Sequence, residues 1–205
     1  MTSILLAAVL FGLTAWAGIA AARYVCAGID PLPDGPRTGV VPERVLIGAC
    51  AVLGAIAASR GLAFGGIAVI ALACGLFVAI WAADVARGIV PDLFTLVPLG
   101  AVLLAAALAG RWEVVVAAVV SAIPFAILAW RSQGMGMGWG DVKLAALGGP
   151  LIGMQNALLA FAVGALAAVV IARVRGRAGE PIAFAPYLVS AIALPLAVLT
   201  PGMTG

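Results

Sequence analysis

Two aspartates attract attention because the sequence around them is almost entirely apolar. Asp84 follows the apolar segment 62–83, and Asp141 opens another apolar segment directly behind the glycine-rich stretch 136–140. An ionisable side chain at membrane depth costs free energy, so it is a candidate functional residue until another reason for it is found. Two such carboxyls favour acid–base chemistry at a membrane boundary.

Each aspartate also has a structural explanation. Asp141 begins an apolar helix, where its side chain can cap free backbone N–H groups and where the helix dipole favours a negative charge. Asp84 ends its helix, where the dipole disfavours an anion, but Arg87 could pair with it if the helix continues for another turn. A pair of carboxyls that shares one proton, as in aspartic proteases, is the catalytic alternative. In that hypothesis Asp141 activates water and Asp84 donates a hydrogen bond to the scissile carbonyl.

The residues around Asp141 allow two interpretations as well. Gly134, Gly136, Gly138 and Gly140 alternate, so the backbone can adopt positive φ angles and approach an extended substrate closely; a flexible loop between helices is the alternative. Lys143 lies two residues beyond Asp141 and therefore on another face of the helix. It either anchors the helix at the membrane interface or on lipid phosphate, or balances charge near the site.

The composition is that of an integral membrane protein. Hydrophobic residues make up 65% of the chain and charged residues 9%, and the mean hydropathy is +1.26, whereas soluble domains are about one-quarter charged. The absence of histidine removes the commonest metal ligand and the usual general base. Cys26, Cys50 and Cys74 form no CxxC pair, which argues against a zinc site or a disulfide framework. Cys50 and Cys74 are expected to be small packing residues.

Apolar runs that are interrupted by charge, glycine or proline predict eight transmembrane segments. The first is expected to be a retained anchor rather than a cleaved signal, because no positive charge precedes it and Arg23 follows it. The sixth is the shortest and is expected to be a half-helix or a tilted helix inside the bundle. The predicted segments are 3–22, 45–59, 62–83, 93–110, 114–130, 142–153, 154–172 and 182–201.

The distribution of cations sets the expected orientation. With the N-terminus outside and eight crossings, nine of the eleven Lys and Arg residues face the cytosol, and only Arg60 and Arg111 face outward. The net charge of +3 therefore reports membrane orientation rather than affinity for nucleic acid. The sequence predicts an all-α polytopic transmembrane helix bundle, organised as one domain over residues 1–205 with a short cytosolic loop at 23–44. Asp84 and Asp141 both arrive on its cytosolic side.

At this point the motifs resemble those of the type IV prepilin peptidases, which are membrane aspartic proteases of the GxGD type. The stretch 136–144, which reads GMGWGDVKL, is similar to the second active-site motif of that family. Asp84, followed by Pro91 and by the stretch 92–96, is similar to the first. The resemblance covers most of the chain from about residue 62 onward.

The resemblance implies a leader peptidase of a prokaryotic inner membrane, with a cytosolic active site and prepilin-like or pseudopilin-like substrates. Asp84 and Asp141 would be catalytic, and Gly136, Gly138, Gly140 and Lys143 would form the active-site loop. The acids activate water themselves, so no metal or organic cofactor is expected. The partners are the substrate and membrane lipid. The acidic Asp92 and Glu180 are candidates for attracting a basic leader.

The chain departs from the family pattern in two places. Many relatives carry a cytosolic domain with paired CxxC motifs between their first two spans, which is associated with methylation of the new pilin N-terminus; here the stretch 23–44 holds one cysteine. The resemblance therefore implies the peptidase and does not extend to the methyltransferase activity. The segment 182–188 has Ala183 and Ala185 where relatives usually have proline and glycine.

Two other functions stay open on the residues alone. A small proton- or cation-coupled transporter could use Asp84 and Asp141 as ion-binding groups. Such a protein would usually place its acids near mid-span, in broken helices at matched positions of two halves. A structural membrane subunit would use Asp141 as a cap and Asp84 in an ion pair.

Overall fold

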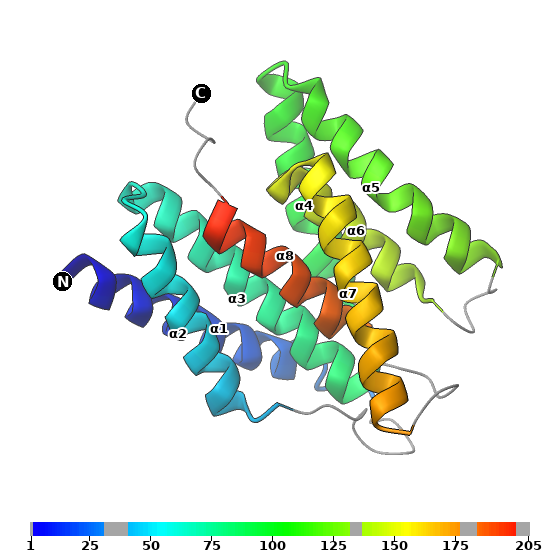
Figure 1. The fold of residues 1–205 in the computed structure, drawn as a ribbon, viewed down its shortest axis with the longest axis horizontal. Helices are drawn as coiled ribbons and strands as arrows, with labels where there is room; N and C mark the ends of the chain where they lie inside the picture. Colours follow the sequence, from blue (N-terminus) through cyan, green and yellow to red (C-terminus); the bar gives the residue numbers. More distant parts are fainter. Residues whose placement is uncertain (1, 31–40, 132–136, 177–183, 200–205) are drawn as a thin grey trace. The chain divides into compact units, whose positions relative to one another are not determined.

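The structure is a computed structural model that describes residues 2–30, 41–131, 137–176 and 184–199. Within these residues the secondary structure consists of eight α-helices and no strands, which confirms the predicted all-helical polytopic fold (Figure 1). The helices are α1 (Thr2–Val25), α2 (Glu43–Ser59), α3 (Phe64–Arg87), α4 (Asp92–Leu108), α5 (Trp112–Arg131), α6 (Trp139–Ile152), α7 (Met154–Val174) and α8 (Ala185–Leu199).

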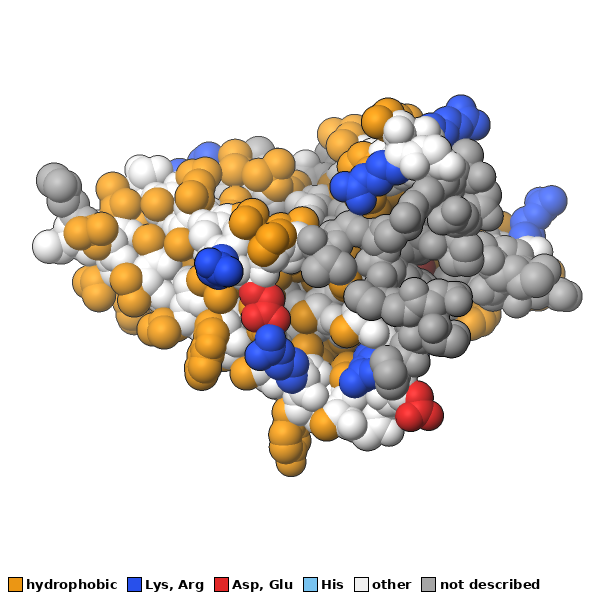
Figure 2. All heavy atoms as spheres, turned by 90° about the horizontal axis from the view of Figure 1, so that it is seen from below, with side chains coloured by type: hydrophobic (Ala, Val, Ile, Leu, Met, Phe, Trp, Pro, Cys, Tyr) orange, Lys and Arg blue, Asp and Glu red, His pale blue; other side chains and the backbone are white. Residues whose placement is uncertain are grey.

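Four of these helices are long and apolar enough to cross a membrane: α1, α3, α5 and α7, with 20 to 24 residues each. The other four have 14 to 17 residues, short of the ~20 that span a bilayer upright. Large hydrophobic side chains are exposed along the helices, and Figure 2 shows many hydrophobic side chains on one face, together with several Lys, Arg, Asp and Glu side chains. Apolar surface of this extent suits a lipid environment.

Contacts between residues divide the chain into two compact units, the first comprising residues 1–88 and 193–205 and the second residues 89–192. In the first unit, α1 packs against both α2 and α3 (Figure 1). Glycines allow this close packing: a methyl group at Gly75 would lie 2.6 Å from the carbonyl oxygen of Thr14, and one at Gly54 would lie 2.7 Å from that of Ala7. Small residues at such crossings let membrane helices approach through their backbones.

In the second unit, the short helix α6 is surrounded by α4, α5 and α7. Its middle part buries Leu144 and Leu147, and its last turns bury Gly148, Gly149 and Pro150. A methyl group at Gly148 would lie 2.7 Å from Ile192 Cδ1 and 2.8 Å from Phe161 Cζ. Fourteen residues suffice because neighbouring helices, rather than lipid, cover α6. The predicted short helix inside the bundle is therefore confirmed as an interior helix.

Candidate active site

Burial distinguishes two carboxylates from the other acids that the structure describes. Asp84 is 5% exposed and Asp141 is 8% exposed. The remaining described acids are exposed, and they are Asp30, Glu43, Asp92 and Glu113. Charged side chains are rarely buried without a structural or functional reason, because removing a charge from water is costly.

Asp84 lies in the last turn of α3, which continues to Arg87 rather than ending before the acid. The turn closes at Gly88, whose φ of 68° allows its N–H to donate to the carbonyl oxygen of Asp84 at 2.8 Å. A left-handed glycine is a common way to end a helix. Since α3 continues for this extra turn, the condition for the alternative Arg87 ion pair is met, and that alternative stays open.

A small cavity lies in the first unit beside the turn that carries Asp84. It has a volume of 170 Å³ and is lined by α3 residues on either side of the acid, namely Trp81, Ala82, Val85 and Ala86, together with Ile19, Val41, Glu43 and Leu46. Glu43 at this cavity accepts a hydrogen bond from Arg23 at 2.5 Å, which links the start of α2 to the end of α1. The sequence did not reveal this cavity because its lining residues come from three helices and from Val41 before α2, and they form no motif.

Asp141 is the third residue of α6, which begins at Trp139 and therefore two residues before the acid. Its Oδ2 accepts a hydrogen bond from the backbone N–H of Gly138 at 3.3 Å. This is the carboxylate half of a capping box, in which an acid at the third helical position binds the N–H of the residue before the helix. The predicted capping role is confirmed, but the carboxylate acts from the third helical position and not from the start of the helix.

The expectation of positive φ angles before Asp141 is wrong for the two described glycines of the motif. Gly138 has φ −82° and ψ 154°, and Gly140 lies in the first turn of α6. Glycine is needed at position 140 because there is no room for a side chain: a methyl group there would lie 2.8 Å from Val90 Cβ. Gly134 and Gly136 lie outside the described residues, as does Glu180.

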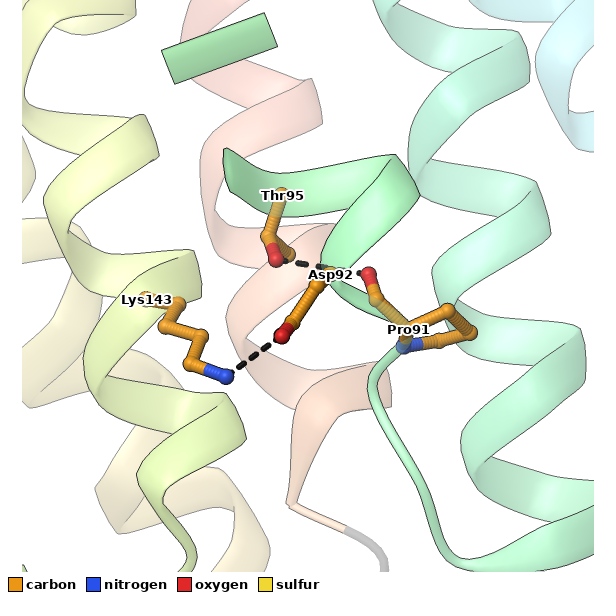
Figure 3. A network of polar contacts seen from close by, with 4 residues as sticks. All are labelled: Pro91, Asp92, Thr95 and Lys143. Atoms are coloured by element: carbon orange, nitrogen blue, oxygen red, sulfur yellow. Dashed lines mark hydrogen bonds and ion pairs between the residues drawn. The ribbon is translucent and has the colours of Figure 1, made fainter. Parts of the chain in front are cut away.

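Lys143 forms an ion pair with Asp92, the first residue of α4 (Figure 3). The start of α4 is itself held together by Thr95, a fully buried residue whose Oγ1 donates to the carbonyl oxygen of Pro91 at 3.3 Å. Of the two uses predicted for Lys143, charge balance next to the site matches this contact. The ion pair joins residues 51 positions apart, which is why the sequence did not reveal it.

The two buried carboxylates belong to different units, Asp84 to the first and Asp141 to the second. Each lies in the terminal turn of a largely apolar helix, at the end of α3 and at the start of α6. A model of the type IV leader peptidase family matches residues 70–173, a range that contains both carboxylates and the Asp92–Lys143 pair. No curated protein and no solved structure gives a significant match.

Proposed function

We propose that this chain, which belongs to the type IV leader peptidase family, removes the leader peptide from type IV prepilin-like or pseudopilin-like proteins at the cytosolic face of a prokaryotic inner membrane. Membership of the family and the long apolar helices make the chain a leader-peptidase-like membrane protease. The substrate, the orientation and the catalytic residues are the parts that we propose.

The observation that carries the catalytic assignment is burial inside the matched region. Asp84 and Asp141 are the buried acids of the described chain, and both lie within residues 70–173. Hydrolysis of a peptide bond without a covalent intermediate requires one group to activate water and another to polarise the carbonyl. We assign the first role to Asp141 and the second to Asp84, with the roles exchanging through the cycle as protons move between the two acids.

The surroundings of Asp141 match those of a group that activates water. Its carboxylate accepts the Gly138 N–H and lies at the positive end of the α6 dipole. Asp84 lies at the opposite end of its own helix, where carbonyl groups rather than N–H groups are unsatisfied. The two acids therefore have different surroundings, as the two roles require.

The proposed orientation follows from the cations and places the N-terminus outside, with the short loop 23–44 in the cytosol. The chain then acts as one peptidase domain, and the helical ends that carry Asp84 and Asp141 meet the substrate where its leader leaves the membrane. With no CxxC pairs at 23–44, we assign no methyltransferase step. The proposed leader removal takes part in pilus assembly or in protein secretion, the processes that use such substrates.

Reconstitution tests this function directly. The purified protein is inserted into lipid vesicles together with a reporter that joins a short basic leader to an apolar membrane helix. We expect release of the leader, detected by mass spectrometry as a new N-terminus at the leader–helix boundary. Proton or cation flux across the vesicles without cleavage would instead support the transporter.

A further inference from the structure

We propose that Asp92 and Lys143 are positioning residues for this protease, and that their ion pair holds the α6 turn that carries Asp141. The inference rests on the proposed function, because it assumes that Asp141 reacts. It assigns to Asp92 a role inside the enzyme, in place of the attraction of a basic leader.

The position of Lys143 is unfavourable unless a counterion is supplied. Lys143 is the fifth residue of α6 (Trp139–Ile152), just beyond the first turn, so the positive end of the helix dipole disfavours its charge only weakly and the ammonium group gains most from a counterion. Asp92 provides the counterion from the first turn of α4, a position where the dipole favours an anion. Asp92 therefore supplies a negative partner for the Lys143 ammonium group. This contact connects the start of α6 to the start of α4.

The contribution of the pair to folding stability is expected to be small. The side chain of Asp92 is 61% exposed and that of Lys143 is 32% exposed. Ion pairs at such exposure contribute about 0–1 kcal/mol, because water screens them and two long side chains lose freedom. The ion pair contributes little to stability, but it joins the start of α4 to the start of α6. Its main effect is therefore expected to be on the position of the start of α6 relative to α4.

The segment Val90–Asp92 touches the first turns of α6 at two separate points. Val90 lies against the backbone of Gly140, close enough that a methyl group there would be 2.8 Å away, and Asp92 binds Lys143 two residues beyond Asp141. Asp141 lies between Gly140 and Lys143 in the chain, so one contact precedes the carboxylate and the other follows it.

The start of α4, which carries Asp92, is held in place by its own hydrogen bonds. The carbonyl oxygen of Pro91 accepts hydrogen bonds from the N–H of Phe94 at 3.0 Å and from Thr95 Oγ1 at 3.3 Å. Phe94 and Thr95 are buried, so the start of α4 is held on its protein-facing side while Asp92 reaches outward to Lys143 (Figure 3). A fixed anchor on one helix can therefore limit the movement of the other.

The pair also controls where the ammonium group goes. Lys143 is the cation closest in sequence to Asp141, and Asp92 gives its charge a partner outside the catalytic turn. When Asp92 loses its charge, the ammonium group is released to move, and the start of α6 loses one of its two contacts with the segment Val90–Asp92. A displacement of about 1 Å at a reacting group can lower a rate by as much as 100-fold.

A double-mutant cycle measures whether the two residues act as one unit. The cycle comprises Asp92→Asn, Lys143→Met and the double variant, assayed for kcat and KM with the leader reporter in vesicles. Lys143→Arg keeps the cation and tests rescue. Glu113→Gln is the matched control, because it breaks an exposed pair with Arg111 (3.1 Å) at the start of α5. Asp141→Asn is measured in the same assay, and membrane insertion and thermal unfolding are followed for every variant.

We expect each single variant to lower kcat by about tenfold with little change in KM. The double variant should be no slower than the worse single variant, since the second change removes a partner that is already lost. Lys143→Arg should recover most of the rate, and Glu113→Gln should behave as the wild type.

Three results would overturn the inference: wild-type rates in both single variants, losses that multiply in the double variant, or a rise in KM at constant kcat for Asp92→Asn, which would assign Asp92 to leader binding. The proposed function has its own readout in this assay. Cleavage that persists in Asp141→Asn would reject the catalytic assignment, whereas loss in Asp141→Asn with wild-type pair variants would reject the positioning role alone.

Discussion

Gly140 lies directly against Val90, so that a methyl group at position 140 would be 2.8 Å from Val90 Cβ and 2.9 Å from Cγ2. Gly138, two residues earlier in the same motif, has only Asp141 Oδ2 and the Gly140 nitrogen near its corresponding position, both at 3.8 Å. Alternating glycines that look equivalent in the sequence are therefore present for different physical reasons: position 140 has no room for a side chain, whereas position 138 does.

The first prediction contrasts these two glycines. Gly140→Ala should displace Val90 or the start of α6 and lower both leader cleavage and thermal stability, because overpacking costs about 1–3 kcal/mol. Gly138→Ala should have a smaller effect on stability, since its methyl group meets only ordinary van der Waals contacts. Unfolding in detergent and the initial cleavage rate are the measurements. Gly100→Ala, with no atom within 4 Å, is the control. Equal losses at 138 and 140 would contradict the packing explanation.

A second prediction concerns the first unit, where α1 and α3 cross at Gly75. Gly75→Ala should destabilise the protein despite the better helix propensity of alanine, because the new methyl group would meet the backbone of Thr14 at 2.6 Å. Gly48→Ala in α2 is the matched change, since nothing lies within 4 Å of it. We expect a lower unfolding temperature for the first variant and an unchanged or higher one for the second. The reverse order would show that α1 and α3 do not pack through these residues.

The cysteines lead to a third prediction. Cys26 is 4% exposed, and burial raises the pKa of its thiol, although the positive charge of Arg87 offsets part of this effect. A raised pKa means less thiolate at neutral pH, and thiolate is the reactive form. Cys26 should therefore react slowly with a maleimide at pH 7 and faster as the pH rises. Cys50 and Cys74, which are also buried, should be protected until the protein is denatured.

The control for this labelling experiment is a cysteine at the exposed neighbour, Ala27→Cys, in a variant whose native cysteines are replaced by alanine. It should react rapidly in the folded protein. Labelling of Cys26 at the rate of the new cysteine at position 27 would contradict the buried environment of the native thiol.

Much of the fold could be predicted because long apolar runs in the sequence identify membrane helices. Apolar runs of sufficient length have few alternatives, and the eight predicted segments correspond to α1–α8 with ends shifted by a few residues. The shifts have local causes. α3 continues past Asp84 because the turn closes only at Gly88, and α6 starts at Trp139 because Asp141 caps it from the third position.

The site was predicted in part. Isolated acids in apolar sequence indicated Asp84 and Asp141, and both are buried. The ion pair next to Asp141 in the chain joins residues far apart in the sequence, Asp92 and Lys143, and no local pattern encodes such a pair. The role of Gly140 was misjudged for the same reason, since its neighbour Val90 comes from another segment.

The central claim is that Asp84 and Asp141 serve one hydrolytic reaction, and single substitutions test it most directly. Asp84→Asn and Asp141→Asn keep the shape of each side chain, so both variants should insert into the membrane and unfold at temperatures close to that of the wild type. Leader cleavage should fall by about 10³-fold in each, within the 10²–10⁴-fold range typical of a lost general acid or base, while the exposed-acid control Asp30→Asn stays active. Cleavage at the wild-type rate by either buried-acid variant would contradict the claim.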